Sequence, residues 1–163
     1  VTNAALQWVP RHLSLIERWV EALGPGGWFA LQVPGNFDAP THALMRETAV
    51  NHPRSGELEA AAKRYGAGDP STYLQILSAH GLVVDAWETT YIHVLDPGGE
   101  SENPVLDWVS GTGLQLMLEV LRDEQEREDF VAAYGEKVRA AYPRSPAGVL
   151  LPFRRVFAVG HRA

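Results

Sequence analysis

The residues that decide the fold are Trp28-Phe29-Ala30-Leu31-Gln32-Val33, which are followed by Pro34-Gly35. A nearly continuous apolar run of this length, closed by turn residues, indicates a central strand of a parallel sheet, buried on both faces. Before it, residues 11–23 carry apolar side chains at helical spacing, and Gly24-Pro25-Gly26-Gly27 ends that helix. Residues 1–6 indicate a short strand that runs into a loop. The order strand, helix, strand is typical of a layered α/β sheet.

The remainder of the chain is predicted to contain further helices and strands. We expect helices over 40–50, 57–65 and 71–80, the last with Tyr73, Leu74 and Leu77 facing inward, and a long strand over 83–95. One or two helices should cover 103–121 with a break near 111–113, and the longest helix should cover 123–142. A final strand over 149–159 contains Pro152, which favours a sheet edge or a bulge. We also expect Trp19 and Trp28 to lie in the core.

Two segments exceed what a minimal sheet with its helices needs, residues 35–69 and 96–147. Ligands of open parallel sheets bind beyond the carboxyl ends of the strands. Residues 35–69 leave from such an end, so we expect them to cover a binding site, and we expect 96–147 to add a helical cap. The length fits one domain or most of one. A buried strand at residues 1–6 needs a neighbour on each side, so we also expect sequence upstream of Val1.

The composition argues against several classes of function. The 163 residues are 45% hydrophobic, have a formal charge of -6 and contain no cysteine. The negative charge argues against a nucleic-acid partner, and no apolar run approaches the roughly 20 residues of a membrane-spanning helix. The lack of cysteine excludes disulfide and thiolate chemistry, which suits a cytoplasmic protein. The six histidines show no metal-ligand spacing, so we expect no metal.

Short motifs along nearly the whole chain resemble those of one family, the class I S-adenosylmethionine-dependent methyltransferases of the trans-aconitate 2-methyltransferase type. The motifs occur in a consistent order: Asn3-Ala4-Ala5-Leu6-Gln7-Trp8-Val9-Pro10, Gly26-Gly27, Gln32-Val33-Pro34-Gly35-Asn36, Pro40-Thr41-His42, Val84-Asp85-Ala86-Trp87-Glu88-Thr89-Thr90-Tyr91-Ile92-His93, Trp108-Val109-Ser110-Gly111-Thr112-Gly113-Leu114, Ala141-Tyr142-Pro143 and Pro152-Phe153-Arg154-Arg155-Val156-Phe157. The resemblance implies that residues 1–163 are the C-terminal part of one methyltransferase domain. It implies a Rossmann-like sheet with helical cap insertions and an antiparallel last strand.

The resemblance also implies an activity, methyl transfer from S-adenosyl-L-methionine to a carboxylate of trans-aconitate to give a monomethyl ester. It places Asn3, Ala4 and Gln7 near the methionine end of the cofactor. The family's glycine-rich cofactor loop and its ribose-binding acid lie upstream of Val1, so these residues alone should bind the cofactor poorly and be inactive. A carboxylic acid titrates at about pH 4, so the acceptor is already ionised at neutral pH and needs no general base. In agreement, the sequence shows no convincing catalytic dyad or triad, and we assign no catalytic residue.

A polyanionic substrate instead needs cationic and hydrogen-bonding side chains. His42 and Arg46 are four residues apart on a predicted helix and share a face. Arg154 and Arg155 are adjacent on a strand and point to opposite faces, while the strand over 83–95 presents alternate side chains from Trp87 to His93 on one face. The predicted substrate contacts are His42, Arg46, Tyr91, His93, Trp108 and Arg154.

Each of these patterns also has a purely structural explanation. His42 and Arg46 fit a solvated helix face, the alternating aromatic residues fit any half-buried strand, and Arg154 and Arg155 fit ion pairs with surface acids. Gly111-Thr112-Gly113 fits a helix break better than a phosphate loop. Two other functions stay open: a methyltransferase for another small acid, and a non-catalytic α/β module that binds a partner or pairs with a second copy through an exposed strand.

Overall fold

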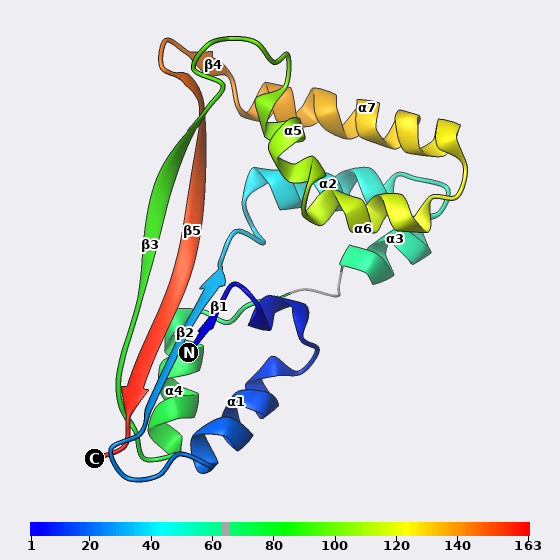
Figure 1. Cartoon of the computed structure of the whole chain (residues 1–163). Coiled ribbons are helices and arrows are strands. Elements are labelled where there is room, and N and C mark those ends of the chain that lie inside the picture. The colour runs from blue at the N-terminus through cyan, green and yellow to red at the C-terminus, as the bar shows by residue number, and fades with distance from the viewer. Residues whose placement is uncertain (63–65) are drawn as a thin grey trace. The chain divides into compact units, whose positions relative to one another are not determined.

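The computed structural model describes residues 1–62 and 66–163, which fall into two compact units. The sheet unit holds the described residues of 1–36, 66–91 and 153–163, and the helical unit holds those of 37–62 and 92–152. Strands β3 (Val83–Leu95) and β5 (Gly148–His161) contribute residues to both units (Figure 1). The helical unit contains most of the two predicted insertions. Their role as a cap over a substrate stays a prediction.

The strands form one mixed sheet in the order β1-β2-β5-β3, and β4 (Arg144–Ser145) pairs with β5. Strand β1 (Thr2–Asn3) runs parallel to β2 (Trp28–Pro34), whereas β5 runs antiparallel to β2. The α/β class, the central strand over 28–33 and the antiparallel last strand are therefore confirmed. Strand β5 as a whole lies between β2 and β3, but β2 no longer flanks it at Pro152, so the edge position predicted from Pro152 holds locally. Pro152 is tolerated because the pairing with β2 ends at Arg155, so no bond to β2 is lost.

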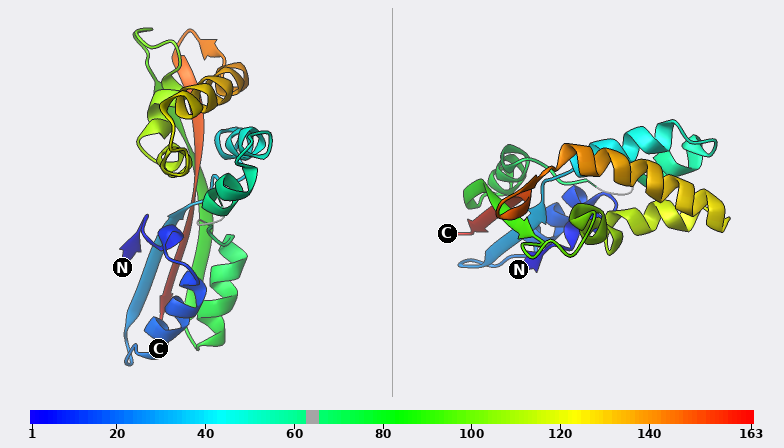
Figure 2. Two further views of the ribbon diagram at one scale, coloured as in Figure 1. Left: turned by 90° about the vertical axis from the view of Figure 1, so that its right-hand side faces the viewer. Right: turned by 90° about the horizontal axis from the view of Figure 1, so that it is seen from above.

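Helices α1 (His12–Glu21) and α4 (Pro70–Ala79) cover one face of the sheet unit (Figure 1 and Figure 2). Ile16, Val20, Tyr73 and Leu77 of these helices are fully buried, and they pack in one cluster with Leu31, Val33, Val156 and Ala158 of the sheet. Side chains alternate along a strand, so Gln32, Arg155 and Phe157 belong to the opposite face.

Three side chains that the sequence predicted to be buried are exposed. Leu74 is 39% exposed, Trp19 is 42% exposed and Trp28 is 64% exposed. Helical spacing identifies the inward face of α4 through Tyr73 and Leu77, but it does not show that the contact is too narrow to include Leu74. Trp28 is the first residue of β2 and stacks on His161 of β5, with ring centroids 4.6 Å apart, at a strand end where few neighbours surround it.

The helical unit contains α2 (Pro40–Val50), α3 (Ser55–Ala62), α5 (Pro104–Ser110), α6 (Gly113–Val120) and α7 (Glu124–Ala141). The Asp123 side chain accepts hydrogen bonds from two N–H groups of the first turn and caps α7. The predicted helices are confirmed, including the break between α5 and α6, although residues 63–65 of the helix predicted over 57–65 lie outside the described residues. No helix in the described part of the chain combines the length and apolarity needed to cross a membrane.

Candidate functional site

The three residues predicted to contact the cofactor lie at the end of β1 and in the turn and short 3₁₀ helix that follow it. Asn3 is in register with Gln32 of β2, and the Ala4 N–H donates to the Gln32 carbonyl at 2.9 Å. Ala4 has a φ of 49°, in the left-handed region, so the chain turns sharply there. Gln7, in the 3₁₀ helix η1 (Leu6–Trp8), donates from Nε2 to the Ala4 carbonyl at 2.8 Å. The turn follows the carboxyl ends of two parallel strands, where α/β sheets bind ligands.

Buried amide groups in the sheet unit leave polar atoms without a partner. Gln7 Oε1, Gln32 Nε2 and Asn36 Oδ1 are unpaired in residues that are 6%, 7% and 8% exposed. The orientation of two amides is fixed by the hydrogen bonds that they do make, from Gln7 Nε2 to Ala4 and from Arg155 Nη1 to Gln32 Oε1 at 2.9 Å. An unpaired buried polar atom costs about 1–3 kcal/mol and calls for an explanation such as a bound molecule. The Gln7 acceptor fits the N–H groups at the methionine end of the expected cofactor.

Sequence reasoning selected Gln7 but missed Gln32 and Asn36. The signal for Gln32 was present, because it is the one polar residue in the apolar run over 28–33. A polar side chain in a buried strand destabilises the fold unless it forms a hydrogen bond that replaces those it made with water. Asn36 follows the strand and Pro34-Gly35, where polar residues are ordinary, so the sequence gave no comparable signal.

The adjacent residues Arg154 and Arg155 have separate sets of partners, as expected of opposite strand faces. Arg154 donates to Glu88 at 3.0 Å, to Asp69 at 2.7 Å and to the Gly35 carbonyl at 3.2 Å. The hydrogen bonds to Glu88, and then to Asp69, raise the pKa of the Arg154 guanidinium. Two carboxylates around one guanidinium leave a local charge of about -1, which favours the ion-pair interpretation of Arg154 over a substrate contact.

In the helical unit, the structure brings His42 and Arg46 together around the start of α2. The His42 ring stacks on Phe37 with centroids 5.4 Å apart, and Arg46 Nη1 donates to the Phe37 carbonyl at 2.6 Å. Arg46 Nη2 lies 3.8 Å from Asp38, which is fully exposed. Burial, and secondly the charge of Arg46, lowers the pKa of His42, so the ring is neutral at neutral pH. A cation and a neutral imidazole side by side can bind a carboxylate by charge and by hydrogen bond.

The break between α5 and α6 lies against the same imidazole. A Cβ atom added to Gly113 would stand 3.4 Å from His42 Cε1, so the α6 start packs close to His42. His93 and Trp108 form a second pair in the helical unit, with ring centroids 6.2 Å apart. Tyr91 and Arg154 belong to the sheet unit, as do Asn3, Ala4 and Gln7. The six predicted substrate contacts therefore include two neighbouring pairs, His42 with Arg46 and His93 with Trp108.

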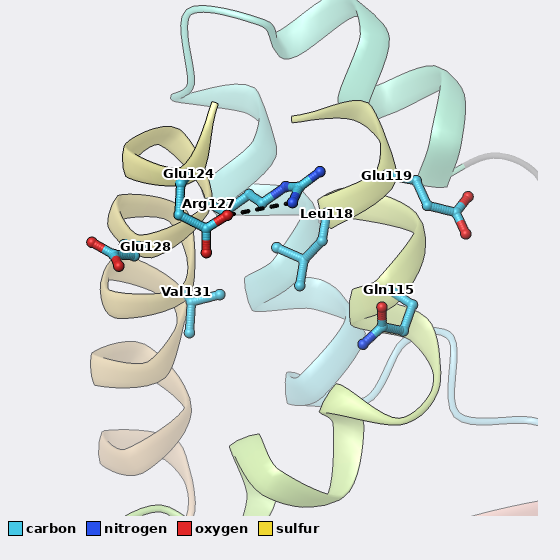
Figure 3. A pocket seen from close by; sticks show the side chains of 7 residues that line it. All are labelled: Gln115, Leu118, Glu119, Glu124, Arg127, Glu128 and Val131. Carbon is cyan, nitrogen blue, oxygen red and sulfur yellow. Dashed lines mark hydrogen bonds and ion pairs between the residues drawn. The ribbon is translucent and has the colours of Figure 1, made fainter. Parts of the chain in front are cut away.

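A surface hollow of about 390 Å³ in the helical unit has the wrong charge for a polycarboxylate. Figure 3 shows its lining side chains, Gln115, Leu118, Glu119, Glu124, Arg127, Glu128 and Val131. The single cation, Arg127, is already bound to Glu124 and to the Leu121 carbonyl, so three carboxylates dominate the field. None of the predicted site residues lines this hollow. The described residues also contain no group of three or more His, Asp or Glu side chains placed to hold a metal ion.

The curated proteins that the chain resembles are methyltransferases by name, and more narrowly trans-aconitate 2-methyltransferases. No family model matches the chain. The chain is 48% identical over 163 residues to a trans-aconitate 2-methyltransferase of Streptomyces avermitilis, covering 99% of this chain and 59% of the relative. It is 50% identical over 165 residues to that of Streptomyces coelicolor, covering 99% and 53%. It is 42% identical over 164 residues to that of Mycobacterium tuberculosis, covering 98% and 60%.

These identities confirm the resemblance stated from the sequence, because they extend over almost every residue of the chain. The chain spans between about half and two thirds of the length of these curated relatives. The activity, substrate and cofactor of the whole protein are therefore taken up as proposals.

Proposed function

We propose that the native protein transfers a methyl group from S-adenosylmethionine to a carboxylate of trans-aconitate and forms a monomethyl ester. The observation that carries this proposal is the identity of 42–50% over 98–99% of the chain with relatives named trans-aconitate 2-methyltransferase. The turn at Asn3 and Ala4 and the unpaired acceptor of Gln7 add local support, because they fit the polar end of a cofactor at the carboxyl ends of β1 and β2. A cytoplasmic location is part of the same proposal.

The cofactor, when bound, supplies a methyl group on a positively charged sulfur, which is ready for attack by an oxygen. Asn3, Ala4 and Gln7 are the described residues that we propose to hold its methionine end. The side-chain amide oxygen of Gln7, Oε1, is buried and unpaired. An N–H group placed beside it would gain a hydrogen bond without displacing a protein partner.

The acceptor imposes a different requirement on the protein. Its carboxylates are ionised at neutral pH, so the residues that bind it need to orient one oxygen and exclude water, and no base has to remove a proton. Orientation of this kind can lower the activation free energy by about 7–11 kcal/mol. A cation on the reacting oxygen would reduce its nucleophilicity, so cationic side chains belong on the carboxylates that do not react. Arg46, with neutral His42 beside it, is suited to this task.

The test is methyl transfer by the complete native polypeptide from labelled S-adenosylmethionine to a panel of small acids. Trans-aconitate should accept label, and mild base should release the label because esters hydrolyse under those conditions. An Arg46→Gln variant should raise KM for the acceptor with little change in KM for the donor, whereas Glu128→Gln in the acidic hollow serves as a control that should change neither. Transfer to none of the polycarboxylates would refute the proposal, and transfer only to another acid would redirect it to that substrate.

A further inference from the structure

Three residues of the sheet unit place polar groups together on the face opposite α1 and α4. Val156 and Val33 pack under the helices, so their neighbours Arg155 and Gln32 point to the other face. Asn3 is in register with Gln32 and shares its face. The Arg155 guanidinium donates from Nη1 to Gln32 Oε1 at 2.9 Å and lies over the Phe153 ring, 4.9 Å from its centroid. Arg155 is therefore held next to the turn predicted to contact the cofactor.

Arg155 carries a charge that its surroundings do not neutralise. Among residues 1–62 and 66–163, no carboxylate lies within ion-pair distance of its guanidinium, whereas the neighbouring Arg154 contacts both Glu88 and Asp69. Gln32 is more than nine-tenths buried, and its Nε2 donor has no partner. A guanidinium with no carboxylate partner, held by a buried amide, offers paired N–H donors that suit the two oxygens of a carboxylate.

We propose that Arg155 binds a carboxylate beside Asn3, and that Gln32 is the positioning residue that holds the guanidinium. The inference rests on the proposed function, since the site adjoins the turn that would hold the methyl donor. Gln32 Nε2 is shielded from solvent, so the anion meets the guanidinium first and Gln32 acts by fixing its orientation. Two molecules of the reaction carry the required group, the acid that is methylated and the amino-acid end of the methyl donor. The shared chemistry is the carboxylate.

The experiment measures binding as well as turnover, using the complete native polypeptide. Calorimetry gives Kd for trans-aconitate and for S-adenosylhomocysteine, the unreactive product form of the donor, in the native protein and in Arg155→Ala, Arg155→Lys and Gln32→Glu. Gln32→Glu retains an oxygen for Arg155 to bond but places an anion at the site. The matched control is Arg18→Ala, an exposed arginine on α1 of the same unit, which is assigned to no site. Thermal unfolding of each variant shows that it is folded.

The expected result is that Arg155→Ala and Gln32→Glu weaken one of the two ligands by about ten- to a hundredfold, while Arg155→Lys recovers part of the affinity. Weakened trans-aconitate assigns the site to the acceptor, and weakened S-adenosylhomocysteine assigns it to the donor. Affinities within about twofold of native for both ligands in folded Arg155→Ala would overturn the inference, as would native protein that binds neither. If Arg155→Ala weakens binding but the native protein transfers no methyl group, the proposed function fails and the carboxylate site stands.

Discussion

Replacement of Tyr134 by Phe tests the hydrogen bond that ties α7 to α2 beside His42. The Tyr134 hydroxyl is buried and donates to the carbonyl of Thr41, the residue that precedes His42, at 3.0 Å. Burial raises the pKa of the Tyr134 phenol, so the hydroxyl stays protonated and remains a donor at any pH near neutrality. Phenylalanine keeps the ring and its packing and removes only this bond.

The expected loss of unfolding free energy is about 1 kcal/mol, the net value of one hydrogen bond. Thr41 lies in the first turn of α2, so its carbonyl still accepts from the N–H four residues later once the hydroxyl is removed. The larger penalty of about 1–3 kcal/mol for an orphaned buried group therefore does not apply. For a domain of this size, 1 kcal/mol corresponds to a Tm shift of roughly 2–4 °C.

Urea unfolding of the complete native polypeptide, followed by circular dichroism, measures this difference. Tyr91→Phe is a matched control, because it removes the same hydroxyl from a tyrosine that is 45% exposed. Its unfolding free energy should change by less than about 0.5 kcal/mol. Equal midpoints for the two variants would refute the assigned bond, and a loss above about 3 kcal/mol in Tyr134→Phe would refute the claim that packing is retained.

Three further predictions follow from single contacts. Arg154→Ala should lower the unfolding free energy by no more than about 1 kcal/mol, and less at high salt, because Glu88 and Asp69 are 48% and 68% exposed. Burial holds the pKa of His42 below the ordinary histidine value of 6.5, so the stabilisation by the neutral ring is fully present above that pH and is lost as pH falls toward the pKa of the folded state. His42→Gln should therefore flatten the acid side of the stability–pH profile, measured by unfolding at several pH values. Gly148 has a φ of 118° and would place a Cβ 2.7 Å from the Leu95 carbonyl oxygen, so Gly148→Ala should cost at least about 1–3 kcal/mol in unfolding free energy, whereas Gly56→Ala in open space on α3 should be neutral or stabilising.

Much of the fold could be predicted because local signals and tertiary structure agree. Residues 40–50 and 83–95 form a helix and a strand with the predicted bounds, since a proline starts the helix and turn residues close the strand. The position of β5 inside the sheet could not be read from Pro152. A proline reports only that its own N–H is not used, and β5 satisfies this by extending past the end of β2.

The candidate site was harder to predict because residue type does not reveal whether a charged side chain is already paired with another group of the protein. Spacing correctly grouped His42 with Arg46, since a helix fixes which residues share a face. It gave no means of seeing Phe37, which both side chains contact from a loop before the helix. It also could not show that Gln32, an isolated polar residue in an apolar strand, would be bonded to Arg155, which is 123 residues away in the sequence.

The difference between Arg154 and Arg155 shows that the summed charge of the neighbouring groups decides which arginine can bind an anion. Two unit charges 4 Å apart interact by about 4 kcal/mol at an effective dielectric constant of 20, so the sign of the summed local charge outweighs one added hydrogen bond. A carboxylate that approaches Arg154 meets Glu88 and Asp69 as well, and the sum is repulsive. At Arg155 it meets a cation whose described protein partners are a neutral amide and an aromatic ring, and the sum is attractive. Both arginines are alike in the sequence, so only their tertiary partners separate a structural ion pair from a candidate anion site.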